Sequence, residues 1–138
     1  MSNALYPKWK ESLLTGVANC ALNGSGATGV YAALVDTGTY TYSAAHQFYS
    51  DLSGIGGTPV EIGATKSYTS GVFKGANITW TAVAGTVSYE AIVLYIKNAG
   101  ANTTWNLVAF MDTNVGLPIT SNGGDISISW NASGIFSL

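Results

Sequence analysis

"EAIVLYIK", residues 90–97, is an almost unbroken apolar run that is rich in β-branched and aromatic side chains. A run of this length is short for a helix, and its composition favours a β-strand. "VYAALVD" at 30–36 and "WNLVAFMD" at 105–112 have the same character. A strand without polar alternation must be covered on both faces. The three runs therefore predict the centre of a sheet that is buried on both sides.

Other segments alternate between apolar and polar residues. In "NITWTAV" at 77–83, Ile78, Trp80 and Ala82 fall on one side of the expected strand. Glycines separate the strand candidates at turn positions, a spacing typical of an all-β sandwich. We therefore expect an all-β fold, an antiparallel and jelly-roll-like β-sandwich. Further strands are expected at 125–131 ("DISISWN") and, on weaker patterns, at 58–62 ("TPVEI") and 67–73 ("SYTSGVF").

"LYPKWKESLLTG", residues 5–16, predicts a short N-terminal helix. Pro7 suits the first helical position, and Trp9, Leu13 and Val17 lie near one face. A helix of this length is marginal alone, so it must dock on its own domain, on a sister subunit or on a partner. We expect one domain, 1–138, in which a helical segment at 1–22 precedes a β-sandwich at 28–138.

A second short helix is expected between strands, starting at Ser43 as the N-cap and ending before Gly54. Its apolar residues recur at i, i+3, i+4 and i+7, which is the spacing of an amphipathic helix. They are Ala45, Phe48, Tyr49 and Leu52.

His46 is the only histidine of the chain and falls in the first turn of that expected helix, off its apolar stripe. A metal site needs three or four converging ligands, and one His, one Cys and seven scattered acids do not suggest one. No motif supports a Ser-His-Asp triad, and nothing in the sequence places Glu61 beside Glu90 as a glycosidase pair. We expect no catalytic residue, no cofactor and no metal, and a scaffold or interface role for His46.

The segment 24–29 matches G-x-G-x-x-G formally, through Gly24, Gly26 and Gly29. A dinucleotide fingerprint must follow a strand and open a helix, whereas here a helix precedes and a strand follows. We interpret the segment as a loop. Cys20 is single, so no intramolecular disulfide can form, and it is expected to be a small buried apolar residue.

Charged residues make up 9% of the 138 residues, the net charge is −2, and all five basic residues are Lys. Nucleic-acid binding is therefore not expected, since Arg carries most phosphate and base recognition. No apolar run is long enough to cross a membrane and no signal peptide is evident, so we expect a soluble, unexported protein without membrane contact.

Three blocks resemble a family of small tailed-bacteriophage virion proteins: "LYPKWKESLLTG" (5–16), "LVDTGTYTYSAAHQFYSDL" (34–52) and the stretch 116–138 with "GLPITSNGGDISISW" and "IFSL". The resemblance runs end to end, and its central block is the most specific. It implies a virion structural protein. A capsid cement or decoration protein is the further expectation, made in the host cytoplasm, placed on the capsid exterior and bound to the major capsid protein.

Low charge and abundant aromatic residues suit extensive interfaces, where Tyr and Trp are enriched. The second face of the two-sided apolar strands needs cover, some from the N-terminal helix and the rest from a partner subunit, so the strands also predict a homo-oligomer, expected to be a trimer. The alternative is a tail or fibre-associated structural module, with possible glycan or host-surface binding through Trp and Tyr. Candidate interface residues are Tyr6, Trp9, Leu13, Phe48, Tyr49, Tyr95 and Trp105.

Overall fold

A computed structural model describes residues 3–63, 65–113 and 116–138. It is built from antiparallel strands and one α-helix, so the all-β prediction is confirmed. The helix is α1 (Pro7–Leu14), and short 3₁₀ turns occur at η1 (Gly26–Thr28), η2 (Tyr49–Asp51), η3 (Thr69–Gly71) and η4 (Asn102–Thr104). The strands are β1 (Ala4–Leu5), β2 (Val30–Val35), β3 (Ile55–Glu61), β4 (Val72–Phe73), β5 (Ile78–Trp80), β6 (Ser88–Tyr89), β7 (Ala91–Ile96), β8 (Leu107–Met111), β9 (Ile119–Thr120), β10 (Ile126–Ile128) and β11 (Phe136–Ser137).

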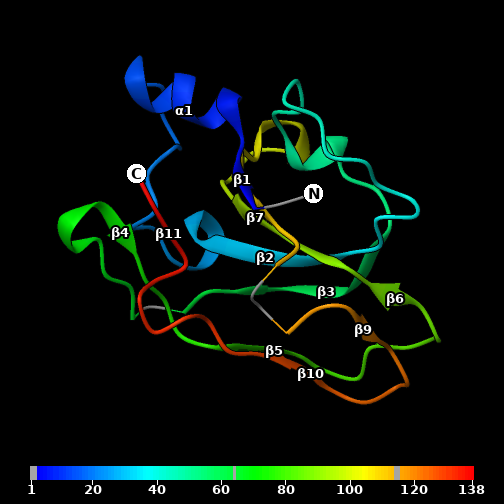
Figure 1. The fold of residues 1–138 in the computed structure, drawn as a ribbon. Helices are drawn as coiled ribbons and strands as arrows, with labels where there is room; N and C mark the ends of the chain where they lie inside the picture. Colours follow the sequence, from blue (N-terminus) through cyan, green and yellow to red (C-terminus); the bar gives the residue numbers. More distant parts are fainter. Residues whose placement is uncertain (1–2, 64, 114–115) are drawn as a thin grey trace.

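A five-stranded antiparallel sheet with the order β1-β8-β7-β2-β3 forms the centre of the molecule. The three apolar runs of the sequence supply its middle strands, as predicted. All six residues of β7 pair in register with β2, from Ala91 opposite Val35 to Ile96 opposite Val30. α1 and the β5–β10 ribbon lie at opposite ends of the molecule, with this sheet between them (Figure 1).

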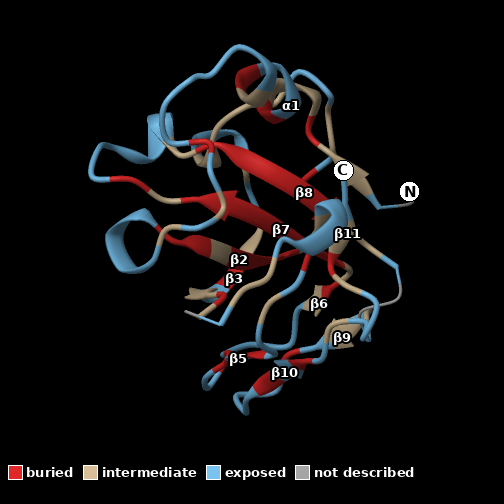
Figure 2. Cartoon of the chain, turned by 90° about the vertical axis from the view of Figure 1, so that its left-hand side faces the viewer, coloured by how far each residue is buried: buried red, intermediate tan, exposed pale blue. Residues whose placement is uncertain are grey.

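Both faces of the central sheet are covered by the chain itself. Every residue of β7 and of β8 is buried, and Figure 2 shows these strands red along their length. On one face, the ring of Phe110 lies against Tyr40 and Tyr42 from the connection between β2 and β3. On the other face, Met111 lies beside residues of the C-terminal segment. The apolar strands therefore need no sister subunit, and the premise that predicted an oligomer is wrong.

The remaining strands form three separate two-stranded ribbons, β10–β5, β11–β4 and β6–β9. They do not join into one second sheet, so the jelly-roll-like sandwich is not confirmed. Two local features keep these strands short. The stretch 67–73 contains the turn η3, with Ser70 in the left-handed region at φ 57°. Ala82, at φ 47°, interrupts the alternation after β5, so that Val83 is buried and Ala82 is exposed.

The N-terminal helix is confirmed, with Pro7 at its start. It ends in a Schellman motif in which the amide of Gly16 (φ 70°) donates to the Leu13 carbonyl and the amide of Val17 donates to the Ser12 carbonyl. Val17 therefore lies beyond the helix and is 53% exposed, so its predicted place on the apolar face is wrong. Strand β1, which precedes the helix and pairs with β8, was not predicted.

The helix expected at 43–52 does not form, and only the 3₁₀ turn η2 occurs there. The Ser43 hydroxyl accepts a hydrogen bond from the Ala45 amide within a tight turn. Further on, the backbone bonds to the start of β8 and the residues before it: the amide of Leu107 donates to the Gln47 carbonyl, and the amide of Tyr49 donates to the Trp105 carbonyl. Pairing with a neighbouring segment thus replaces the i→i−4 bonds of a helix.

Candidate functional site

The candidate interface residues separate into two groups. Tyr6, Trp9 and Tyr95 are at most 3% exposed, so their predicted role at the surface is wrong: they belong to the core of this chain. The others are partly exposed and able to contact a partner. They are Leu13, Phe48, Tyr49 and Trp105.

Three rings form a row, which we call the aromatic row: Tyr31 on β2, Tyr95 on β7 and Trp105, two positions before β8. Tyr31 and Tyr95 are direct cross-strand partners with ring centroids 5.8 Å apart. Trp105 continues the row at 5.9 Å from Tyr95, with the two planes only 8° apart. Tyr49 packs on Tyr95 at 4.5 Å. The structure thus brings together three of the predicted residues and adds Tyr31, whose place depends on a strand register that the sequence does not fix.

Lys97 completes the aromatic row. Its ammonium group lies 5.2 Å from the ring centroids of both Tyr31 and Trp105, within the range of a cation–π contact. Burial raises the pKa of Tyr95, and the nearby Tyr49 and Tyr31 raise it further, so its phenol stays neutral at ordinary pH. Tyr31 and Trp105 are partly exposed and lie beside the Lys97 ammonium group, whereas Tyr95 between them is buried. The sequence could have indicated Lys97, because it follows Tyr95 by two positions and lies directly after β7.

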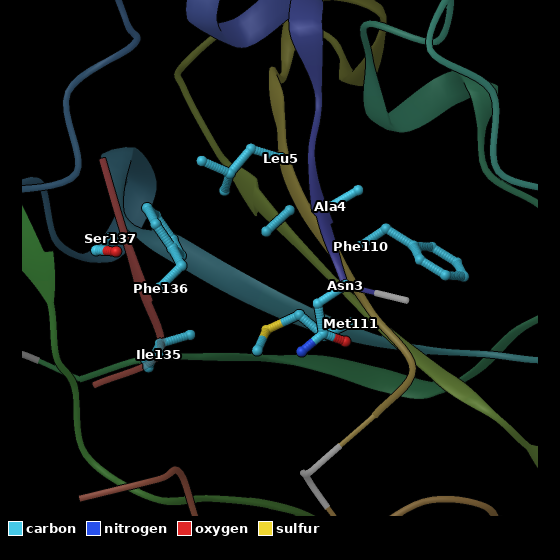
Figure 3. Close-up of a pocket in the computed structure, with 9 residues that line it drawn as sticks. Asn3, Ala4, Leu5, Phe110, Met111, Ile135, Phe136 and Ser137 are labelled. Atoms are coloured by element: carbon cyan, nitrogen blue, oxygen red, sulfur yellow. The ribbon is translucent and has the colours of Figure 1, made fainter. Parts of the chain in front are cut away.

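A groove lies between β1 and β11, with a volume of about 210 Å³. In Figure 3, the side chains of Leu5 and Phe136 extend from these two strands into the space between them. None of the described residues along the groove is charged. Its lining consists of Asn3, Ala4, Leu5, Ala109, Phe110, Met111, Ile135, Phe136 and Ser137.

Among the described residues, each strand beside the groove is paired along one edge only. The amide of Tyr6 donates to the Val108 carbonyl, and hydrogen-bonded pairs alternate along an antiparallel ladder. The amide and carbonyl of Leu5 therefore point away from β8. By the same alternation, the amide of Leu138 donates to the Gly71 carbonyl, so the backbone of Ser137 points away from β4. Exposed edges of this kind can accept an extended chain.

His46 takes part in a short hydrogen-bonded chain. Its Nδ1 lies 2.8 Å from the hydroxyl of Tyr40, which in turn lies 2.8 Å from the hydroxyl of Tyr6. Burial raises the pKa of Tyr6, and the bond to Tyr40 adds to this shift. Burial would also raise the pKa of Asp51, but hydrogen bonds from the Phe48 and Gln47 amides, with His46 nearby, hold it below its usual value. His46 is half-buried and linked to the core, rather than turned to solvent.

We expect His46→Ala to lower the free energy of unfolding by about 1 kcal/mol or less. One hydrogen bond to Tyr40 is lost, and a typical bond of this kind contributes about 0.5–1.5 kcal/mol. Tyr40 keeps Tyr6 as a partner, so no buried hydroxyl is left without one. Urea denaturation of the two proteins measures the difference. A loss of function with unchanged unfolding would instead assign His46 a direct functional role.

Within the described residues, no group of three or more His, Cys, Asp or Glu side chains is placed to hold a metal ion. The described part of the chain also has no helix both long and apolar enough to cross a membrane. Comparison of the sequence with models of known families, and of the chain with curated proteins and solved structures, finds no match.

Proposed function

We propose that this chain is a non-enzymatic virion structural protein of a tailed bacteriophage, and that it acts as a capsid cement protein. In this role it binds the major capsid protein on the outside of the particle and stabilises the lattice. The support from sequence is the resemblance of the blocks 5–16, 34–52 and 116–138 to such virion proteins. The low content of charged residues fits a protein that functions in contact with neighbouring proteins.

The observation that carries the docking proposal is the uncharged groove between β1 and β11. Leu5 and Ser137, whose backbone groups point away from β8 and β4, both line it, and Leu5 and Phe136 provide apolar surface. An extended segment that adds to a sheet edge gains main-chain hydrogen bonds, while alternate side chains enter adjoining pockets. An apolar, extended arm of the major capsid protein has the chemistry that this groove accepts.

A homotrimer on the capsid is part of the proposal, but it no longer follows from uncovered strands, because β7 and β8 are buried within one chain. It rests on the family resemblance alone. Light scattering of the purified protein measures the oligomeric state.

We expect Leu5→Glu to abolish binding to capsids that lack this protein. The substitution places a carboxylate among apolar side chains in the groove, and burial of an unpaired charge is strongly unfavourable. Leu14→Glu is the matched control, because Leu14 is 87% exposed on α1 and lies outside the groove. Co-sedimentation with capsids measures binding, and thermal melting of each variant verifies the fold.

Full binding by a folded Leu5→Glu variant would place the docking surface elsewhere. If Leu5→Glu does not fold, Ser137→Glu gives the same test at an exposed position on the opposite wall.

The alternative, a tail or fibre-associated module, is distinguished by copy number. A stained gel of purified particles gives the ratio of this protein to the major capsid protein. A cement protein is expected in an amount comparable to the major capsid protein, and a tail component in a small fraction of it. The partly exposed Trp105 and Tyr31 at the ends of the aromatic row are the feature that favours this alternative.

A further inference from the structure

A second depression, which we call the amide pocket, is lined by residues that include Thr104 and Asn106, the two chain neighbours of Trp105. It has a volume of about 510 Å³, within the range of small-molecule sites. Of the nine described residues that line it, four carry carboxamides and none is charged. The lining consists of Val17, Ala18, Asn19, Gln47, Phe48, Asn98, Gly100, Thr104 and Asn106.

The carboxamide of Asn98 holds together the loop that forms one side of the amide pocket. The Asn98 side-chain carbonyl accepts hydrogen bonds from the Gly100 amide at 2.7 Å and the Thr104 hydroxyl at 3.1 Å. Its Nδ2 donates to the Thr104 carbonyl at 2.9 Å. Asn98 is 8% exposed, and these three bonds fix the loop 98–104 that forms one side of the pocket.

Two other carboxamides retain hydrogen-bonding capacity. Asn106 is 5% exposed, and its Nδ2 donates to the Asn19 carbonyl at 3.3 Å. Its side-chain carbonyl has no partner among the described residues, nor does the side chain of Gln47. Each carboxamide offers acceptor and donor groups side by side. The pocket therefore presents both kinds of group without a net charge.

The sheet holds these groups in place. Phe48 forms an isolated bridge with Asn106, and the Leu107 amide donates to the Gln47 carbonyl. The Asp51 carboxylate accepts bonds from the amides of Gln47 and Phe48 at 2.8 and 2.9 Å. The backbone that carries Gln47 and Phe48 is thus fixed from both sides, as a preorganised binding site requires.

We infer that the amide pocket binds a neutral oligosaccharide. Adjacent donor and acceptor groups match pairs of sugar hydroxyls, while Phe48 and Val17 provide apolar surface for the C–H face of a sugar ring. A phosphate or carboxylate ligand would call for a Lys or Arg in the lining, and a metal ion would call for carboxylates. Neither is present in the described lining. The inference is independent of the capsid role, because the groove and the amide pocket share no residue.

The test is a titration of the ¹⁵N-labelled protein with maltotetraose, mannotetraose and chitotetraose, followed by two-dimensional NMR. We expect saturable shifts for at least one sugar, with the side-chain amide signals of Gln47 and Asn106 among those that move. Gln47→Ala should weaken that binding by about five- to tenfold, the worth of one net hydrogen bond. Val17→Glu, at a position that is 53% exposed, should also weaken it by crowding the pocket.

Asn102→Ala is the matched control, since Asn102 is an exposed residue of η4 that does not line the pocket. It should bind as the unchanged protein does. Absence of shifts with all three sugars would overturn the inference. Equal binding by folded Gln47→Ala and Val17→Glu variants would also overturn it. Capsid binding by Gln47→Ala should be unchanged, so failure here and failure of the cement proposal are distinguishable.

Discussion

Replacing Trp9 with alanine is expected to lower the free energy of unfolding by about 3–5 kcal/mol, the usual cost of truncating a buried Trp or Phe. Trp9 is 1% exposed, its indole Nε1 donates to the Cys20 carbonyl at 2.9 Å, and its ring meets Phe136 edge-on at 5.8 Å. The substitution removes all of these contacts and leaves a cavity. Denaturant unfolding of the isolated protein measures the loss.

Leu14→Ala is the control on the same helix, because Leu14 is 87% exposed and its loss should change stability by less than about 0.5 kcal/mol. The pair distinguishes two roles that the sequence left open for α1. A helix that packs on its own domain destabilises the free protein when Trp9 is truncated. Unchanged melting of Trp9→Ala, with loss of capsid binding, would show that α1 is an attachment arm in solution.

Replacing Gly56 with alanine is expected to cost about 1–3 kcal/mol or more, the range for overpacking a well-filled core. A Cβ atom at this position would overlap the ring of Tyr89, which is 5% exposed and has little room to move. Either the ring leaves its rotamer or the strands separate. Thermal melting of the variant gives the loss of stability.

Gly63→Ala is the matched control, because a Cβ atom there would meet no atom of the described residues within 4 Å, its chain neighbours aside. It should melt close to the unchanged protein. A stable Gly56→Ala variant would mean that the ring of Tyr89 moves aside at little cost. The combined substitution Gly56→Ala and Tyr89→Leu should recover part of the stability, since it removes the overlap.

The centre of the fold could be predicted because composition and pattern agreed there. The runs at 30–36, 90–97 and 105–112 are apolar on both sides, and the structure buries them on both sides. What the pattern could not show is which segment covers each face. Tyr40 and Tyr42, whose rings cover one face, come from the irregular connection between β2 and β3. No periodic pattern in that segment predicts that these rings pack on the sheet.

At 43–52, where a helix was expected, pairing with a segment distant in sequence overrides the local helical pattern. Phe48 and Tyr49 have helical spacing with Leu52, but their backbone pairs with 105–107, more than fifty positions away in the chain. Intrinsic helix preference is worth only tenths of a kcal/mol per residue, so tertiary pairing readily overrides it.

The surfaces were only partly predictable. Aromatic content identified Tyr49, Tyr95 and Trp105, and the structure places their rings in contact. Aromatic content also indicated Tyr6 and Trp9 as interface residues, but both are buried. Aromatic residues occur in cores as well as in interfaces, so content alone does not separate the two. The groove and the amide pocket are each formed by segments from distant parts of the chain. Local sequence patterns do not predict which distant segments lie side by side.

Strand β1 bears on the order in which the molecule can fold. Ala4 lies opposite Phe110, and the Asn3 side chain accepts hydrogen bonds from the amides of Asp112 and Thr113. During synthesis, the first strand therefore has no partner until more than a hundred further residues have emerged. Contacts of such long sequence separation slow folding, because the chain loses the entropy of loop closure before any stabilising hydrogen bond forms. The N-terminus joins the sheet late, and a bulky fusion at this end would delay the step that completes the edge of β8.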